Sequence, residues 1–369
     1  MNRLNELQLR RLAPVFLLAL GCALLIPTAA CAATDGNAGN SSDEAPEAGS
    51  GTTNTSDLVA MLPESATTLG YVDFAMIRDS AAYQYLRNDD VLNDADFEDI
   101  IGETGIDPRT DLHRIAFVSE EGFGTWDDRG AFVVLATFDR DVIITSMGEV
   151  PTDDYSDRTL YQIGAIDRDD DDSDGEMDMV EFDADINGWM TFLTDEILAF
   201  GTDQSLRAIV DVADGAANAR DNPALMGLLE DVDADAHLWL VSAQEGMFSG
   251  VTPGAGNPMG QIGYDRINAM IVALDLSDGL SLRMRGRTGA EEDAKNLGDA
   301  LNGMVALGKM MLQSNSPEIF EILDNNIDTG SRGRDVTVNA DLSIEDLEAL
   351  RAYAESMIEF ENSDEGVIG

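Results

Sequence analysis

The residues whose types and spacing most clearly suggest chemistry are the carboxylates of residues 170–181. In a loop that starts at Asp170, the oxygen donors are Asp170, Asp172, Asp174, Glu176, Asp178 and Glu181, with a glycine at position 6. Alternate carboxylates can converge on one hard cation, the glycine permits a sharp turn, and the last Glu closes the coordination shell. The segment therefore predicts a calcium site.

The same segment has a second interpretation, as a solvated hairpin tip. The whole chain is acidic, with 71 Asp and Glu against 22 Lys and Arg, so a run of aspartates arises easily. Only Gly175 and Glu181 add independent information. The flanking segments predict strands, which argues against an EF-hand domain but leaves room for a strand-flanked calcium loop. Both interpretations stay open on the sequence alone.

Three arginines, Arg283, Arg285 and Arg287, project from one face of a single predicted strand. They suggest contact with an anion or an acidic carbohydrate, or cross-strand pairing with the surrounding carboxylates. The two histidines, His113 and His237, stand beside predicted strands without a partner motif and favour structural roles. The chain has no nucleophile elbow, no His-Glu-x-x-His and no Walker loop, so the sequence predicts no catalytic residues.

Cys31 ends a segment that is typical of an export signal. A basic start precedes an apolar run over residues 13–26, and small residues lead to the cysteine. The pattern predicts that Cys31 is lipidated and anchors the chain in a membrane, although Thr28 stands where such sites usually have Leu. Two alternatives are cleavage near Ala30 or Ala32 without lipid, and an uncleaved anchor.

The net charge of −49 limits the partners of the folded part. Lys295 and Lys309 are the only lysines, a balance that resembles proteins from salt-rich environments. Nucleic acid and anionic lipid surfaces are poor partners for such a body, whereas cations and proteins with basic faces suit it. The apolar content of 44% predicts a folded protein rather than a disordered one.

The chain divides by composition and periodicity into several segments. They are a signal at residues 1–33, a flexible acidic tether at 34–61, an α+β part at 62–244, a linker at 245–263, a hairpin-helix part at 264–360 and a tail at 361–369. Strand patterns broken by helices, without strict alternation, predict an α+β fold. We expect mostly antiparallel sheets with helices packed on one face.

Two signs suggest that the folded part consists of tandem related halves. A hairpin followed by a helix is predicted at residues 189–213 and again at 267–312. An Arg-Ile pair also opens a predicted strand in each half, at 114–115 and at 266–267.

Two segments carry a resemblance to known proteins. The folded domain opens with Leu62-Pro63-Glu64-Ser65-Ala66 and Tyr71-Val72-Asp73. A second segment follows later in the chain, Phe192-Leu193-Thr194-Asp195-Glu196-Ile197-Leu198-Ala199-Phe200-Gly201. In this layout the chain resembles bacterial envelope lipoproteins of unknown function. The resemblance covers most of the folded part and implies an envelope location, but no activity.

Together these features predict an exported, lipid-anchored protein of the cell envelope that binds or scaffolds rather than catalyses. Its partners would be the membrane, through the N-terminal anchor, and another envelope component, with calcium as a stabilising ion and no nucleic acid. The alternative is a secreted hydrolase that uses a carboxylate pair on a polysaccharide. A third interpretation is a purely structural surface protein, which would be expected to self-associate.

Overall fold

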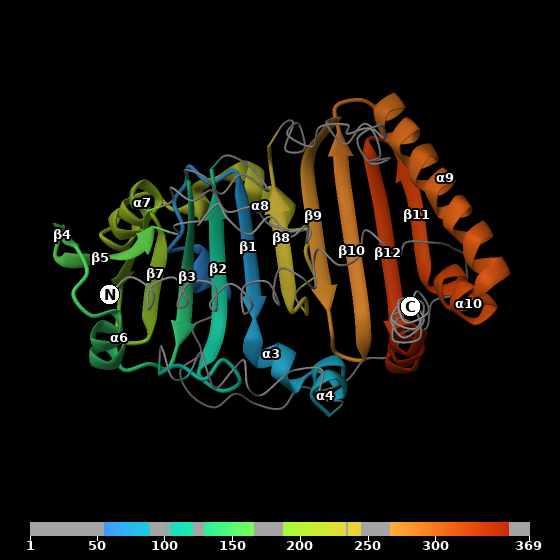
Figure 1. Ribbon diagram of the computed structural model, residues 1–369. Coiled ribbons are helices and arrows are strands. Elements are labelled where there is room, and N and C mark those ends of the chain that lie inside the picture. The colour runs from blue at the N-terminus through green and yellow to red at the C-terminus, as the bar shows by residue number, and fades with distance from the viewer. Residues whose placement is uncertain are drawn as a thin grey trace, which may run out of the picture.

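The computed structural model describes residues 55–88, 101, 105–120, 129–165, 187–233, 235–244 and 266–353. Twelve strands of this part form one antiparallel sheet (Figure 1). They are β1 (Thr68–Asp73), β2 (Leu112–Ser119), β3 (Gly130–Ala136), β4 (Thr152–Tyr155), β5 (Arg158–Ala165), β6 (Asn187–Phe192), β7 (Ile197–Thr202), β8 (Leu238–Ser242), β9 (Ile267–Asp275), β10 (Gly279–Thr288), β11 (Ile327–Arg332) and β12 (Asp335–Ser343). The predicted α+β class with an antiparallel sheet is confirmed.

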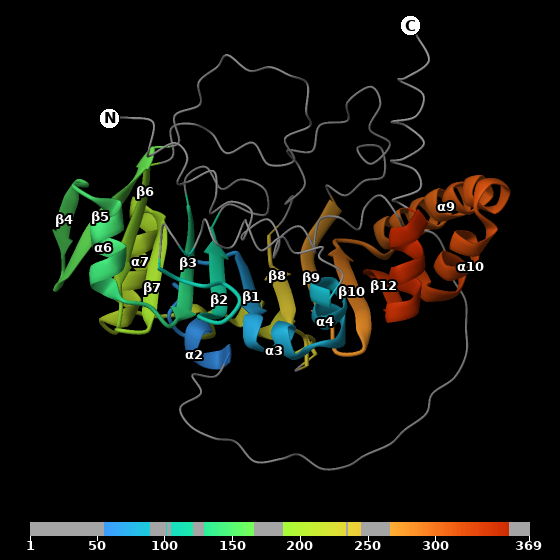
Figure 2. The same cartoon turned by 60° about the horizontal axis from the view of Figure 1, so that its bottom comes forward.

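Helices connect and cover these strands. They are α2 (Thr55–Val59), α3 (Phe74–Asp79), α4 (Ala81–Asn88), α6 (Arg140–Met147), α7 (Asp203–Ala213), α8 (Pro223–Leu229), α9 (Glu291–Asn315) and α10 (Pro317–Asn326), with a further helical stretch at residues 344–353. Figure 2 shows α6 and α7 beside one end of the sheet and α9 and α10 beside the other.

Outward from the centre of the sheet, both directions share an order of five strands, and one direction then adds β5 and β4 at its edge. The order is β11-β12-β10-β9-β8-β1-β2-β3-β7-β6-β5-β4. On each side a three-strand meander is followed by a helix, and a returning hairpin then adds its second strand beside the third strand of the meander. We call β1 to β7 the first half and β8 to β12 the second half. They meet where β1 and β8 pair antiparallel.

Of the two expected signs of duplication, the Arg-Ile pairs fall on equivalent strands of this repeat, whereas the two hairpin-helix segments do not correspond to each other. The two Arg-Ile pairs, 114–115 and 266–267, lie at the starts of β2 and β9, which are equivalent strands. The hairpin-helix at 267–312, however, corresponds to β2, β3 and α6. The one at 189–213 corresponds instead to β11, β12 and the helical residues 344–353. By strand order β8 begins the second half, and the expected linker at 245–263 lies outside the described residues.

The helices pack on both sides of the sheet, so the expectation that they cover one face was wrong. One hydrophobic cluster packs α2, α7 and α8 against the side that carries Tyr71, Trp239 and Ile271. We call this the α7 side. Two other clusters pack α9 and α10, or α6, against the opposite side, which carries Val72 and Leu240. We call this the α9 side. The cause is that the central strands are apolar on both faces, and every residue of β1 and β8 is buried.

Local sequence explains where the elements around the centre begin and end. The carboxylate of Asp73, the last residue of β1, accepts the backbone N–H of Met76 and so caps α3 directly behind the strand. Asn222 caps α8 in the same way, with Pro223 at the first helical position. Within β1, Gly70 leaves room for the ring of Phe117, because a Cβ at Gly70 would lie 1.9 Å from Cζ of that ring.

Candidate functional site

The three predicted arginines of β10 lie on the α7 side of the sheet, where β10, β12 and β11 present polar side chains. Arg283 and Arg285 stand directly opposite Ala273 and Ile271 of β9, which share that side. None of the hydrophobic clusters includes a residue from this face of β10 or β12. The exposed fractions of the side chains are 49% for Arg283, 29% for Arg285 and 42% for Arg287. We call these three residues the arginine strip.

Each guanidinium group of the arginine strip has a carboxylate partner. Nη2 of Arg283 lies 2.6 Å from Oδ1 of Asp341, and Nη2 of Arg285 lies 2.5 Å from Oδ2 of Asp231, which follows α8. The predicted cross-strand pairing is therefore present, and one of the three pairs reaches across β9 to the loop behind α8.

Arg287 makes the best-defined pair, because its guanidinium is bidentate. Its Nε and Nη2 donate to the two carboxylate oxygens of Asp335 at 2.7 and 3.1 Å. This hydrogen bond lowers the pKa of Asp335, against partial burial, and raises the pKa of Arg287. A guanidinium group has five N–H donors in a rigid fork, so a bidentate pair fixes its orientation and leaves further donors for another acceptor.

A second cluster of charged and polar groups lies at the centre of the sheet and is buried. Asp73 is 2% exposed, and its Oδ2 accepts hydrogen bonds from Nε of Arg114 at 2.8 Å and from the hydroxyl of Tyr71 at 3.0 Å. Burial lowers the pKa of Arg114, but the hydrogen bond to Asp73 and nearby negative charge outweigh it, so the net shift is upward. Both carboxylate oxygens of Asp73 accept hydrogen bonds from other residues of the chain, which is the pattern of a structural ion pair.

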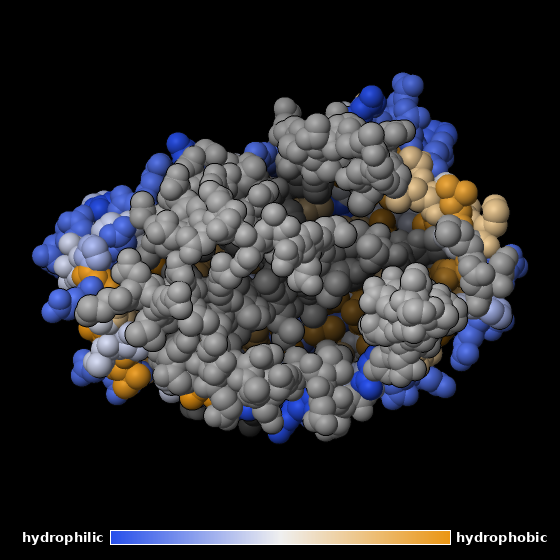
Figure 3. Space-filling view, viewed as in Figure 1, coloured by the Kyte–Doolittle hydropathy of each residue, from blue (hydrophilic) through white to orange (hydrophobic). Residues whose placement is uncertain are grey.

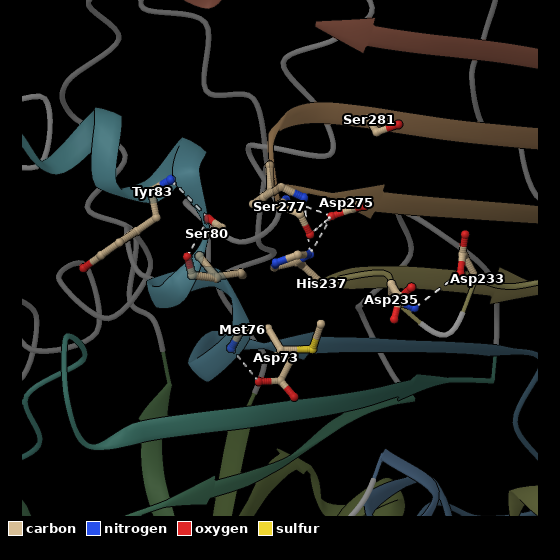
Figure 4. Close-up of polar contacts among 12 residues, drawn as sticks. Asp73, Met76, Ser80, Tyr83, Asp233, Asp235, His237, Asp275, Ser277 and Ser281 are labelled. Atoms are coloured by element: carbon tan, nitrogen blue, oxygen red, sulfur yellow. Dashed lines mark hydrogen bonds and ion pairs between the residues drawn. The ribbon is translucent and has the colours of Figure 1, made fainter. Parts of the chain in front are cut away.

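The buried His237 lies beside Asp275 and Ser277 and could suggest a nucleophilic triad (Figure 4). The hydrogen bonds do not connect these three side chains as a nucleophilic triad requires, from Ser to His to Asp. The hydroxyl of Ser277 donates to Oδ1 of Asp275 at 2.7 Å rather than to the imidazole, and Nδ1 of His237 lies 3.2 Å from the same oxygen. Asp275 also accepts the backbone N–H of Ser277 at 2.8 Å, so the group shapes the turn between β9 and β10.

The other histidine also has a local partner. Nε2 of His113 lies 2.9 Å from the hydroxyl oxygen of Thr137, and burial lowers the pKa of the imidazole. The roles predicted for both histidines therefore agree with their contacts in the structure.

One pocket of about 400 Å³ lies near β5 and β6 and has a polar lining. Arg140, on its rim, lies over the ring of Phe192 at 4.6 Å from the ring centroid. Nη1 of Arg158 lies 2.7 Å from Oδ1 of Asp214, and the hydrogen bonds from Ser156 and Arg158 lower the pKa of this carboxyl group. A carboxylic acid that protonates a glycosidic oxygen needs a raised pKa, so Asp214 is shifted in the wrong direction for that role.

The predicted calcium loop at residues 170–181 and the predicted lipidation site Cys31 lie outside the described residues. Within the residues that the structure describes, no group of three or more His, Cys, Asp or Glu side chains could hold a metal ion. Calcium binding and lipidation therefore stay predictions. No helix of the described part is long and apolar enough to span a membrane.

The sequence did not indicate which carboxylates would meet the arginines. The partner of Arg287 stands directly opposite it in the β10–β12 register, and a hairpin pairing between these strands would have been needed to find it. The partner of Arg285 comes from a loop separated from it by more than 50 residues. Asp73 carried a visible signal, since an Asp just before Phe74 and Ala75 is a typical helix cap.

Comparison with known proteins gives little further guidance. No protein-family model matches the chain, and no curated protein matches it. Two solved structures, crystal forms III and I of TP0453, are similar in part. Form III has 8% sequence identity and a TM-score of 0.41 over 79% of this chain and 96% of that one. Form I has 9% identity and a TM-score of 0.37 over 80% of this chain and 97% of that one. Both scores are too low to assign a family or a function.

Proposed function

We propose that the protein is an exported, lipid-anchored, non-enzymatic binding protein of the cell envelope, and that the arginine strip takes a carboxylated component of that envelope. The observation that carries the proposal is the arginine strip itself. Three guanidinium groups follow one another on one face of β10, each paired with a carboxylate, on a face that contributes no residue to the hydrophobic clusters. The anchor is supported by the sequence of residues 1–33.

The chemistry of the arginine strip suits an acidic carbohydrate. A planar guanidinium group binds a carboxylate in a bidentate manner, and the neighbouring Asp oxygens accept hydrogen bonds from sugar hydroxyls. Because partner carboxylates fix the guanidinium groups, little side-chain entropy is lost on binding. The chain is an acidic body, so we expect long-range repulsion of an acidic polymer at low salt. Near 1 M salt the Debye length falls to about 3 Å and only the direct contacts remain.

The direct test is retention of the full chain on immobilised polygalacturonate, with immobilised dextran as the neutral control, at high and low sodium chloride. We expect retention on polygalacturonate at high salt only. The triple variant Arg283→Gln, Arg285→Gln and Arg287→Gln should lose it. The matched control is Arg109→Gln, because Arg109 also has a bidentate carboxylate partner, Asp107, but lies away from the strip. Equal retention of the triple variant would remove the arginine strip as the binding site.

The hydrolase alternative has less support. In the described part of the chain, the local surroundings lower the pKa of five carboxyl groups: Asp107, Asp153, Asp214, Asp275 and Asp335. A carboxylate-dependent hydrolase needs one carboxyl group that keeps its proton near neutral pH. Release of reducing ends from polygalacturonate by the full chain would revive this alternative.

A further inference from the structure

The second half of α9 exposes apolar side chains to solvent. Gly303, Ala306, Leu307 and Met310 are exposed, and the spacing places them on one face of the helix. Leu307 is 62% and Met310 66% exposed. We call these four residues the outer stripe of α9. Figure 3 shows apolar residues gathered over α9 at one end of the molecule. The opposite face of this part of α9 packs toward the sheet through Leu301 and Leu312, so this part of the helix is apolar on both sides.

The charge pattern changes along the same helix face. One, two and three turns before Gly303, the corresponding exposed positions are Asp299, Asn296 and Glu292. From residue 300 to residue 317 the chain contains no acidic residue, although 71 of its 369 residues are acidic. A helix face that contacts water can carry carboxylates at little cost in free energy. A helix face that enters a medium of low polarity is expected to lack them, because an ionised carboxylate is costly there.

A bilayer suits this surface better than a second copy of the chain. A second copy would bring another strongly acidic body against Glu291, Glu292, Asp293 and Asp299 of the same helix. The lysines of α9 already pair within the chain, with Asp299 and Asp324. No cation of α9 therefore offsets the repulsion between two copies. Zwitterionic headgroups carry no net charge and so bring no such repulsion.

The expected tether brings this surface within reach of the membrane that holds the anchor. α2, where the described chain begins, packs beside β1 and β2, and α9 contacts β11, six strand positions from β2. At about 4.8 Å per strand the span along the sheet is roughly 29 Å, and α2 and α9 pack on opposite sides, which adds roughly 20 Å across the sheet. The 23 residues from 32 to 54 can extend over at most roughly 76 Å, which exceeds this span. The anchor and the outer stripe can therefore reach the same membrane, and the anchor raises the effective concentration of the stripe there.

We propose that the outer stripe of α9 lies in the interface of the zwitterionic bilayer that holds the N-terminal anchor. The inference rests on the proposed lipid anchor. Two large apolar side chains supply only a weak contact, and the anchor converts it into an intramolecular one. The acidic body would then be held in a fixed orientation on the membrane, with β11 and α10 close to the headgroups.

The test uses the full chain with its lipid anchor, reconstituted in phosphatidylcholine vesicles at high salt. A single dye-labelled cysteine at Met310→Cys reports contact with nitroxide lipids by quenching. The only native cysteines, Cys22 and Cys31, lie in the signal segment. Asp299→Cys on the same helix face is the matched control. We expect quenching at 310 about threefold stronger than at 299.

A second dye position is needed because labelling residue 310 itself replaces one of the two large apolar side chains. With the dye at Ala306→Cys, the double change Leu307→Asp and Met310→Asp should reduce quenching to the level seen at residue 299. These side chains are exposed, so the unfolding midpoint in the absence of vesicles should stay unchanged.

Flotation with the vesicles separates the two proposals. A chain that does not float lacks the anchor, which contradicts the proposed function. A chain that floats but shows equal quenching at 299 and 310 overturns the present inference alone. A dye at 310 that is already shielded without vesicles also overturns it, since the stripe is then covered by this chain or by a second copy.

Discussion

The two halves of the sheet share an order of five strands but use the two sides of the sheet differently. In the first half, α7 covers one side with buried apolar residues, and the short helix α6 packs on the other. In the second half, the long helix α9 covers the side that bears α6, and β10 and β12 present charged groups on the other. The exposed large apolar residues of the described part are Val142, Leu307 and Met310, which belong to α6 and α9, the equivalent helices. In the first half, helices thus cover both sides of the sheet, whereas in the second half one side of β10 and β12 stays polar and outside the hydrophobic clusters.

The largest effect should follow from breaking the junction between the halves. Val241 of β8 is fully buried, and Val241→Asp would place an unpaired charge where β8 joins β1. We expect a loss of about 4 kcal/mol or more in the free energy of unfolding, measured by urea titration at high salt.

The matched control for the junction is Val142→Asp on α6, where the side chain is 45% exposed. We expect this change to cost less than about 0.5 kcal/mol. If the two variants lost similar stability, the junction would not be the core of the molecule.

The equivalent arginines at the starts of β2 and β9 compare the halves directly. Arg114 pairs with the buried Asp73, so Arg114→Ala leaves a buried carboxylate unpaired and should cost about 3 kcal/mol. Arg266 pairs with Asp293, and its own side chain is 55% exposed, so Arg266→Ala should cost less than about 1 kcal/mol. Chemical denaturation of both variants measures the difference, and equal losses would contradict the assignment of the buried pair to the first half.

The predicted calcium loop belongs to the first half and has no counterpart in the second, where α10 leads directly into β11. If residues 170–181 bind calcium, the ion at 100 times its Kd should add about 2.7 kcal/mol to the free energy of unfolding. Glu181→Ala should abolish this gain. Thermal unfolding with calcium and with chelator, at fixed high sodium chloride, measures it. No shift in either condition would leave the segment as a solvated acidic turn.

The smallest expected effect concerns the arginine strip and depends on pH. The pKa of Asp335 is lowered in the folded state by Arg287, so the pair stabilises the fold above the unfolded pKa of about 3.9. This contribution is lost as the pH falls through the lower, folded pKa. Asp335→Asn should therefore cost up to about 1 kcal/mol at pH 7, since both groups are partly exposed.

In strong acid the same variant and the unchanged chain should unfold alike, because Asp335 is then protonated in both states of the unchanged chain. Unfolding midpoints measured at several pH values follow the difference. A difference that persisted in strong acid would mean that Asp335 acts through something other than its charge.

Sequence patterns predicted the helices and strands better than they predicted which elements pair or pack with one another. The alternation in β10 and the apolar stripe of α9 were visible, because each depends on neighbours within one segment. The sequence did not predict helices α2, α3, α6 and α10 or strands β4 and β11. The two strands lie at the edges of the sheet and have few apolar residues to mark them. Packing on both sides of the sheet was also missed, because a strand buried on both faces shows no alternation.

The candidate site could be predicted only in part for the same reason. Arg283, Arg285 and Arg287 share a face by the period of a strand, which the sequence shows. Their partners Asp231 and Asp341 are brought to them by tertiary structure, and in a chain with 71 acidic residues the sequence offers no means to choose among them.

The pairing of β1 with β8 has a consequence for how the chain reaches its fold. Val72 pairs with Leu238, so the partner of β1 is synthesised some 160 residues after it. Chains are made from the N-terminus, and the first half can form its meander while one side of β1 still has unpaired N–H and C=O groups. Such an edge, flanked by apolar residues, can pair with a neighbouring chain. Newly made molecules are thus exposed to edge-to-edge aggregation until β8 arrives, and crowding of nascent chains should lower the yield of folded protein more than their final stability suggests.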